Sequence, residues 1–233
     1  MRAAIIQCDA VVPELAQEFG DYPEMIVRMF RETGIEVQFD VFDARTGRFP
    51  ENLDGYDFFI TTGSKAAAYD TDDWIRRLIG FIRELDSQER RLIGICFGHQ
   101  LIALARNGSV ERSPKGWGVG VAGNHLPTTP AWLGKTKQTL NIIVSHQDQV
   151  CTLPADAQVI AASDFCPYFV VQWNDHFLSI QGHPEWHTDY SRALMNLRRD
   201  KIGDARVEAG LASLDTEPDN SLFTGWILDF IEG

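Results

Sequence analysis

Residues 91–108, "RLIGICFGHQLIALARNG", place one cysteine between two glycines where an apolar run meets a helical pattern. The run "RLIGIC" predicts a buried strand, and the next residues predict a helix over about 98–106 that stops at the turn signal "NG". Gly94 and Gly98 remove side chains that would collide in a sharp strand-to-helix turn. The pattern predicts that Cys96 projects from the carboxyl end of a strand.

A helix that begins just after Cys96 would direct its positive dipole end and free N–H groups toward the sulfur. Both favour the thiolate over the thiol. The alternative is a small buried core residue, which is the commonest fate of an isolated cysteine. The two flanking glycines weaken that alternative, so Cys96 is a candidate nucleophile.

The residues before this stretch alternate between β-rich runs and amphipathic segments. Such alternation predicts parallel βαβ units and an α/β fold. The segments are "AAIIQC" (3–8), a helical stretch over 22–33, "IEVQFDVF" (35–42), "YDFFITTG" (56–63) and "DWIRRLIGFIREL" (73–85).

Over residues 116–181 the sequence pattern predicts strands with little helix between them. We expect hairpins appended to the sheet, including "GVGVAG" (118–123), "LNIIVSH" (140–146) and "FLSIQG" (177–182). The chain then turns helical over 188–212 and again over 222–231. No repeat or interdomain linker stands out, so we expect one domain over residues 1–233.

Composition limits the possible partners. The 233 residues carry a net charge of −12. Because binding to nucleic acid or to anionic membranes requires a basic surface, we expect neither. No apolar run is long enough to span a bilayer or to form a signal-peptide core. The four cysteines lack paired spacing, so neither a disulfide framework nor a zinc ribbon is predicted. We expect a cytoplasmic protein with reduced thiols and a small-molecule substrate.

A thiolate needs a proton-transfer partner, and the segment "SIQGHPEW" (179–186) offers one. His183 and Glu185 follow an apolar strand at its carboxyl end, and alternate residues of an extended chain face the same way. Glu185 would orient the imidazole and stabilise its cation, and Pro184 would stiffen the link. A histidine beside a proline in a turn is otherwise often a surface residue. Together with the glycine-flanked cysteine, these residues predict a Cys96, His183 and Glu185 triad.

The stretch "ITTGSKAAAYD" (60–70) ends a predicted strand in Thr62, Gly63 and Ser64. The free N–H groups of this loop would point toward the cysteine. Together with the N–H of Phe97 they would form an oxyanion hole. The alternative is an ordinary glycine turn between a strand and a helix.

Four motifs and their order along the chain resemble those of the class I glutamine amidotransferases. They are "TGS" (62–64), "GICFGHQ" (94–100), "SHQDQV" (145–150) and "HPEW" (183–186). Among these the chain most resembles stand-alone proteins similar to the glutaminase domain of GMP synthase. The resemblance covers nearly the whole chain. It implies a flavodoxin-like doubly wound, mostly parallel sheet with helices on both faces, and hydrolysis of a glutamine side-chain amide through a γ-glutamyl thioester.

The resemblance also implies a role for each matching residue. Cys96 resembles the family nucleophile, His183 the general base and acid, and Glu185 the residue that orients the imidazole. Gly63 and Phe97 match the backbone of the oxyanion hole.

Gln100, Ser145, His146, Gln147 and Asp148 match positions that hold the amino-acid end of the substrate.

The sequence departs from the family pattern in two loops. Thr62 stands where the family often has a second glycine, and "RNGSV" (106–110) replaces a common glycine pair. Because no synthase domain follows in this sequence, we expect any synthase partner to be separately encoded.

Three other motifs suggest cofactors or metals, and none is convincing. "GVGVAG" (118–123) has the spacing of a dinucleotide-binding loop, but "NHLPTTP" after it cannot begin a helix. "HPEWH" (183–187) lacks the helical spacing of a zinc protease motif. His146 and Asp148 imitate an acid/base pair, but a loop histidine often caps local backbone. We expect neither a cofactor nor a metal.

Three functions therefore remain open. The first is an amidotransferase subunit that supplies ammonia to a synthase. The second is a self-contained γ-glutamyl hydrolase or peptidase, because "GICFGHQ" followed by "KGWGVG" (115–120) also resembles γ-glutamyl peptidases. In that case the leaving amine would contact a region around Trp117 and Trp186. The third is a non-enzymatic regulatory module, against which the intact triad argues.

Overall fold

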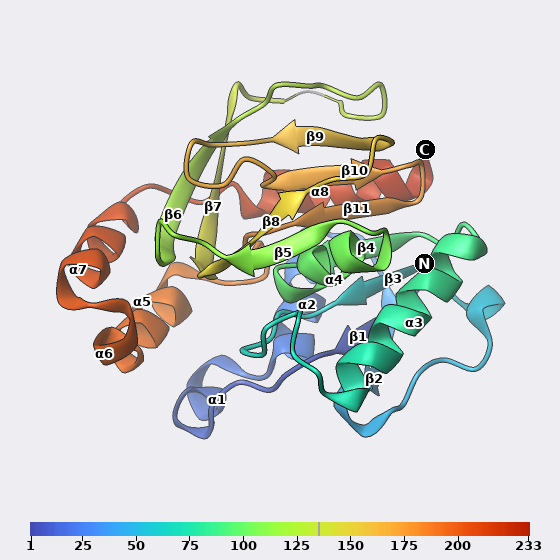
Figure 1. Cartoon of the computed structure of the whole chain (residues 1–233), viewed down its shortest axis with the longest axis horizontal. Coiled ribbons are helices and arrows are strands. Elements are labelled where there is room, and N and C mark those ends of the chain that lie inside the picture. Colours follow the sequence, from blue (N-terminus) through green and yellow to red (C-terminus); the bar gives the residue numbers. More distant parts are fainter. Residues whose placement is uncertain (135) are drawn as a thin grey trace.

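The computed structural model describes residues 1–134 and 136–233. Over these residues the main sheet has seven strands, in the order β2, β1, β3, β4, β11, β10 and β9 (Figure 1). The first five run parallel, and β10 and β9 extend the sheet antiparallel. The strands are β1 (Arg2–Gln7), β2 (Gln38–Asp43), β3 (Phe58–Thr61), β4 (Leu92–Ile95), β9 (Ala157–Ala161), β10 (Val170–Trp173) and β11 (Phe177–Ile180). The predicted mostly parallel sheet is confirmed.

The central strands are apolar on both sides because both faces of the sheet are covered. In β1, Ala3 and Ile5 pack into the core on one face, and Ala4 and Ile6 pack into the core on the other. Successive side chains of a strand point to opposite faces, so a strand buried twice needs an uninterrupted apolar run. This requirement explains the unbroken run "AAII" in the sequence.

Helices cover both faces of the sheet, as in a doubly wound fold (Figure 1). Helices α2 and α8 contribute Phe30 and Trp226 to one core, and α3 and α4 contribute Leu78 and Leu101 to the other. The helices are α1 (Pro13–Phe19), α2 (Tyr22–Arg31), α3 (Asp73–Ser87), α4 (Phe97–Ala105), α5 (Thr188–Leu197), α6 (Arg199–Ile202), α7 (Asp204–Ser213) and α8 (Asn220–Glu232).

One strand lies elsewhere than the sequence suggested. β11, which we expected in an appended hairpin, does pair antiparallel with β10, but its other edge pairs parallel with β4 in the middle of the sheet. All four of its residues are buried. Its apolar run fits a hairpin and a central strand equally well, because local pattern does not reveal which strand lies across the second edge. β11 therefore ends beside β4, and the segments after the two strands meet.

Two small antiparallel sheets form the appended region. One pairs β5 (Ser109–Arg112) with β8 (Asp148–Thr152), and the other pairs β6 (Gly118–His125) with β7 (Thr139–His146). The "GVGVAG" motif lies in β6 and opens no helix. Gly120 has φ +83°, and a Cβ there would lie 2.5 Å from the carbonyl oxygen of Gly210 in α7. This glycine thus permits close packing of a helix on a strand.

The helical region predicted over 188–212 is three helices, α5, α6 and α7, instead of one. Arg198 separates the first two, and Gly203, with φ +93°, separates the last two. Glycine adopts positive φ without the cost that a Cβ imposes, so the chain changes direction there. Within the described ranges, no helix has the length and apolar character needed to cross a bilayer.

Candidate active site

The turn between β4 and α4 has the predicted sharp geometry. Cys96 adopts φ 48° and ψ −93°, a region that residues with a Cβ rarely occupy. A Cβ at Gly98 would lie 1.7 Å from Oγ1 of Thr61, and one at Gly94 would lie 2.6 Å from Cδ1 of Ile102. Both glycines are needed for the chain to pass, and the turn holds the Cys96 side chain at the amino end of α4.

Cys96 is buried, with 6% of its surface exposed, and it lines a cavity at the end of the sheet. The amide Nε2 of Gln181 lies 3.5 Å from its sulfur. Gln181 is fully buried, and it also accepts a hydrogen bond of 3.2 Å from Nε2 of Gln100. The sequence reasoning missed Gln181, although its spacing of two residues before His183 was a usable signal. An amide donor at this distance stabilises negative charge on sulfur.

His183 and Glu185 lie beside the cysteine as a buried pair. Nδ1 of His183 is 2.8 Å from Oε1 of Glu185, and each residue is 3% exposed. Burial of the imidazole opposes its protonation, but the negative charges of Glu185 and Cys96 outweigh burial and raise the pKa of His183 to about 9. The imidazole is therefore a cation at neutral pH, poised between a carboxylate and a sulfur.

Trp186 lies against the imidazole, away from the open region where we expected it. It is 3% exposed, and its ring is stacked on that of His183 with centroids 3.6 Å apart and planes 9° apart. The ring of Tyr22 is nearly parallel to that of Trp186, with centroids 6.4 Å apart. An aromatic face stabilises a cation in contact with it. The stack therefore fixes the plane of the imidazole and favours its charged form.

The loop after β3 reaches the triad at Gly63. A Cβ on this residue would lie 2.8 Å from Cε1 of His183 and 3.7 Å from Cβ of Cys96, so only glycine fits. Among the turn, loop and cap hydrogen bonds of the described residues, none uses the N–H of Gly63 or of Phe97. Two N–H groups beside the sulfur are thus available to an oxyanion.

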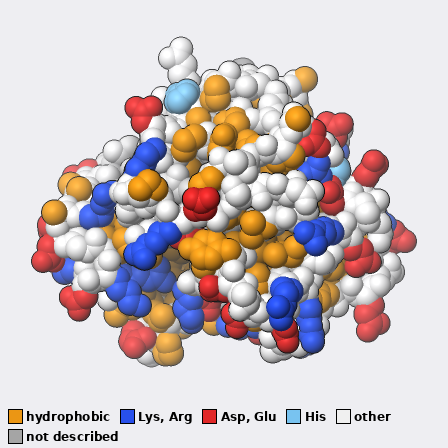
Figure 2. All heavy atoms as spheres, viewed as in Figure 1, with side chains coloured by type: hydrophobic (Ala, Val, Ile, Leu, Met, Phe, Trp, Pro, Cys, Tyr) orange, Lys and Arg blue, Asp and Glu red, His pale blue; other side chains and the backbone are white. Residues whose placement is uncertain are grey.

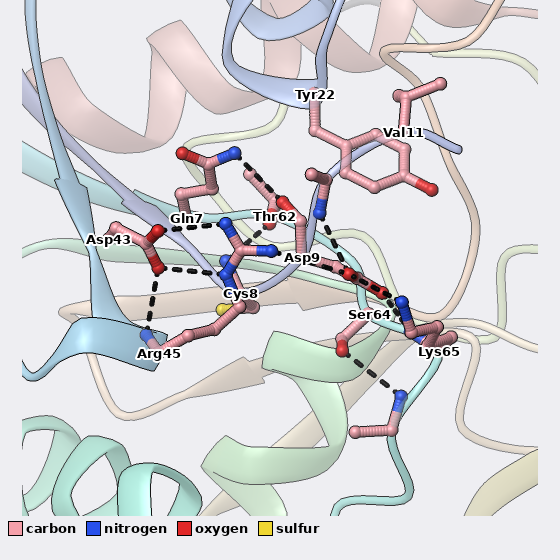
Figure 3. A network of polar contacts seen from close by, with 12 residues as sticks. Gln7, Cys8, Asp9, Val11, Tyr22, Asp43, Arg45, Thr62, Ser64 and Lys65 are labelled. Atoms are coloured by element: carbon pink, nitrogen blue, oxygen red, sulfur yellow. Dashed lines mark hydrogen bonds and ion pairs between the residues drawn. The ribbon is translucent and has the colours of Figure 1, made fainter. Parts of the chain in front are cut away.

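Cys8 and Asp9, which follow β1, hold this loop in place (Figure 3). Oγ1 of Thr62 accepts a hydrogen bond of 2.9 Å from the N–H of Cys8 and donates one of 3.0 Å to the carbonyl oxygen of Gly63. The buried carboxylate of Asp9 accepts a hydrogen bond of 2.9 Å from the N–H of Lys65 and pairs with its ammonium at 3.4 Å. Thr62 thus contributes two hydrogen bonds that fix the loop.

The five residues expected to hold the substrate, Gln100, Ser145, His146, Gln147 and Asp148, line the same cavity as Cys96. Nε2 of Gln100 donates to the carbonyl oxygen of Asp148 at 3.0 Å and so ties α4 to this segment. Among the described residues, neither Oγ of Ser145 nor Nε2 of His146 has a partner. Two buried polar atoms without partners are available to a ligand.

Two basic side chains, Arg198 between α5 and α6 and Lys201 in α6, also line this cavity, whose volume is about 410 Å³. Figure 2 shows Lys and Arg side chains gathered over these two helices. A cavity of this size lies in the range of small-molecule sites. Within residues 1–134 and 136–233, no group of three or more His, Cys, Asp or Glu side chains is arranged to hold a metal.

The arrangement is suited to acyl transfer. A sulfur nucleophile, an imidazolium held by a carboxylate and two free N–H groups are the parts that attack on a carbonyl carbon requires. Two of the other three thiols are poor nucleophiles, because burial raises the pKa of Cys8 and of Cys166 to about 12. Both therefore stay protonated.

A family model and several known proteins match this chain in sequence. A family model described as "Glutamine amidotransferase class-I" matches residues 15–196. Gamma-glutamyl peptidase 3 of Arabidopsis thaliana is 30% identical over 226 residues, which cover 92% of this chain and 90% of that protein. GMP synthase (glutamine-hydrolyzing) of Oceanobacillus iheyensis is 30% identical over 186 residues, 78% of this chain and 35% of the synthase.

Among solved structures, a glutamine amidotransferase from Thermotoga maritima superposes with a TM-score of 0.80 at 20% sequence identity. The match covers 100% of this chain and 98% of that one. At this identity the likeness is one of fold. It agrees with the doubly wound sheet described above.

Proposed function

Because this chain belongs to the class I glutamine amidotransferase family, we propose that it hydrolyses a γ-glutamyl amide bond through a thioester on Cys96. The observation that carries the proposal is the buried pair of His183 and Glu185, 2.8 Å apart beside a cysteine in a strained turn. A strained backbone and a buried charged pair both lower the stability of a fold, and such features cluster at functional sites.

The first half of the reaction forms the thioester. The Cys96 thiolate attacks the carbonyl carbon of the γ-glutamyl amide, and the resulting oxyanion accepts hydrogen bonds from the N–H groups of Gly63 and Phe97. The imidazolium of His183 donates its proton to the leaving nitrogen as the C–N bond breaks. The amine departs and the glutamyl group remains on sulfur.

The second half releases glutamate. Neutral His183 takes a proton from water as the water oxygen attacks the thioester carbon, and the Cys96 thiolate leaves. Glu185 transfers no proton in this scheme, since it holds Nδ1 of the imidazole and stabilises the cation. Gln181 stabilises the thiolate at the start and end of each cycle.

The family relationship leaves two roles for this chemistry. In one, the chain is an amidotransferase that releases ammonia from glutamine for a separately encoded synthase. In the other, it is a self-contained γ-glutamyl hydrolase. One finding favours the second role: the similarity to a γ-glutamyl peptidase extends over 92% of the chain.

Steady-state kinetics on the isolated chain test the proposal and separate the two roles. Glutamine and a panel of γ-glutamyl peptides and amines are offered, and ammonia, amine and glutamate are measured. A kcat/KM at or above about 10⁴ M⁻¹s⁻¹ on a γ-glutamyl peptide or amine, the lower end of ordinary enzymes, supports a self-contained hydrolase. Slow turnover of glutamine alone supports the partner-dependent role.

Cys96→Ser is the matched control, since it replaces only the sulfur atom. The proposal fails if this variant keeps the wild-type rate, or if no compound in the panel is cleaved and a glutamine-like electrophile leaves Cys96 unmodified.

A further inference from the structure

The wall of the active-site cavity formed by α5 and α6 carries two basic residues, Arg198 and Lys201, which line the same cavity as Cys96. In Figure 2 basic side chains gather over this part of the surface. The chain as a whole has 33 acidic and 21 basic residues, so basic residues at a cavity run against its overall charge. Local positive charge of this kind attracts an anionic ligand.

Neither cation forms an ion pair with another described side chain. The contrast with the residue between them is direct, because Arg199 pairs with Asp204 at 3.2 Å and with Glu208 at 2.7 Å. Arg198 is half-buried. A partly desolvated guanidinium without an acidic partner is stabilised when a ligand brings an anion next to it, more than one that is already paired.

Two tyrosines near Arg198 carry no charge that would neutralise it. Its charge acts on the hydroxyls of Tyr22 and Tyr190, which are 3.3 Å apart. Burial raises the pKa of Tyr22 well above its usual value and that of Tyr190 to about 12, so both hydroxyls remain neutral. On another wall of the cavity Lys65 is already paired with Asp9 at 3.4 Å. Arg198 and Lys201 are the cations left for a ligand in the described part of this cavity.

The remaining wall has different chemistry. Gln100 and residues 145–148 supply amide, hydroxyl and imidazole groups together with the carboxylate of Asp148. That set suits the amino-acid end of a γ-glutamyl group, which carries an ammonium. A glutamyl group on this wall, with its acyl carbon at Cys96, leaves Arg198 and Lys201 as the basic lining available to the leaving group.

We propose that Arg198 and Lys201 bind a carboxylate on the leaving group, so that the favoured substrates are γ-glutamyl peptides with a free carboxyl terminus. This inference rests on the proposed function. It goes beyond it by naming the chemical class of the leaving group and the two residues that select it.

The test uses a matched pair of substrates, a γ-glutamyl dipeptide with a free carboxyl terminus and the same dipeptide with that terminus amidated. The two differ in one charge at nearly constant size. For the wild type we expect kcat/KM to be about tenfold or more higher for the acid, since a charge-assisted hydrogen bond exceeds a neutral one. Arg198→Gln combined with Lys201→Gln brings this ratio close to one.

Arg199→Gln is the control, because it removes a neighbouring cation that is already ion-paired, and it should keep the wild-type ratio. Equal rates for acid and amide in the wild type overturn the proposal. An equal loss on both substrates in the double variant also overturns it, because the two cations would then hold the carboxylate of the glutamyl group itself.

Binding to Cys96→Ala, followed by calorimetry, separates this proposal from the proposed function. Tighter binding of the acid than of the amide, lost on replacing Arg198 and Lys201, supports the carboxylate site even if the wild type cleaves neither compound. Cleavage of both compounds at equal rates, with equal binding, leaves the hydrolase function standing and overturns the carboxylate site.

Discussion

His183 and His146 are buried to nearly the same extent, yet at neutral pH the first is a cation and the second is neutral. They are 3% and 4% exposed. The pKa of His183 is raised to about 9, whereas burial lowers that of His146 to about 4. Desolvation acts on both imidazoles in the same direction, so it cannot account for the difference.

The difference lies in the negative charges beside His183, from Glu185 and Cys96, and in what each Nδ1 contacts. In His183 it lies 2.8 Å from the carboxylate of Glu185, and in His146 it lies 3.2 Å from the backbone carbonyl oxygen of Asp148. The carbonyl raises the pKa of His146 too little to offset burial, whereas the carboxylate adds a full opposing charge beside His183. His183 thus has the charge that the proposed proton transfer requires, whereas His146 presents a neutral ring to the cavity.

The strongest way to break this comparison is to remove the charged ring. We expect His183→Ala to lower kcat by about 10²- to 10⁴-fold, the contribution typical of a general acid and base. The loss should approach that of Cys96→Ala, and the double variant should be far from additive. His187→Ala, which changes an exposed neighbour, is the control in the same kinetic assay. Additive losses would mean that Cys96 and His183 do not act as a unit.

Glu185→Gln makes the surroundings of His183 resemble those of His146. The amide keeps a hydrogen-bond acceptor but loses the charge, so we expect the pKa of His183 to fall and kcat to drop about 10- to 100-fold. The measurement is the pH dependence of Cys96 alkylation and of kcat/KM. An unchanged pH profile would contradict the assigned cause of the raised pKa.

Removing the stacked ring should have a smaller effect. Trp186→Leu deletes the face under the imidazolium, and we expect about a 3- to 10-fold loss of kcat/KM with a lowered pKa of His183. Trp186→Phe keeps an aromatic face and should recover most of the loss. If both variants are equally impaired and their pH profiles match that of the wild type, Trp186 acts only by filling space.

The smallest effect concerns stability. The pKa of His183 is above that of an unfolded histidine, so its contribution is complete below pH 6.5 and is lost as pH rises through 9. The pKa of His146 is below that of an unfolded histidine. Its contribution to the free energy of unfolding is therefore present above pH 6.5 and is lost as pH falls through 4. Chemical denaturation across pH should show His146→Asn losing less stability on the acid side than the wild type.

Local signals were enough to predict the triad. Gly94 and Gly98 flank Cys96 within five residues, and His183 and Glu185 are two residues apart, so short windows carried both pieces. The structure adds the strand order that joins them. Steric conflict at Gly98 and a 2.8 Å contact at Glu185 are the physical counterparts of those patterns.

Contacts between distant segments could not be predicted in the same way. The pairing of β11 with β4, the loop held by Asp9 and Thr62, and the amide of Gln181 at the sulfur all depend on which strands become neighbours. Periodicity reports how a residue faces its own strand but not what lies opposite. The single domain over residues 1–233 stays a prediction, supported by a sheet that takes strands from both halves of the chain.

The backbone of Cys96 has a consequence for the evolution of this fold. Its φ of 48° and ψ of −93° cost a residue with a Cβ about 1–3 kcal/mol, and glycine is largely spared this cost. Replacing alanine by glycine within an element ordinarily lowers stability by about 0.5–1 kcal/mol. At position 96 we expect the opposite order in denaturant unfolding, with Cys96→Gly more stable than Cys96→Ala. A lineage that lost the need for the reaction would then drift toward glycine here, and the fold would gain stability as the activity disappeared.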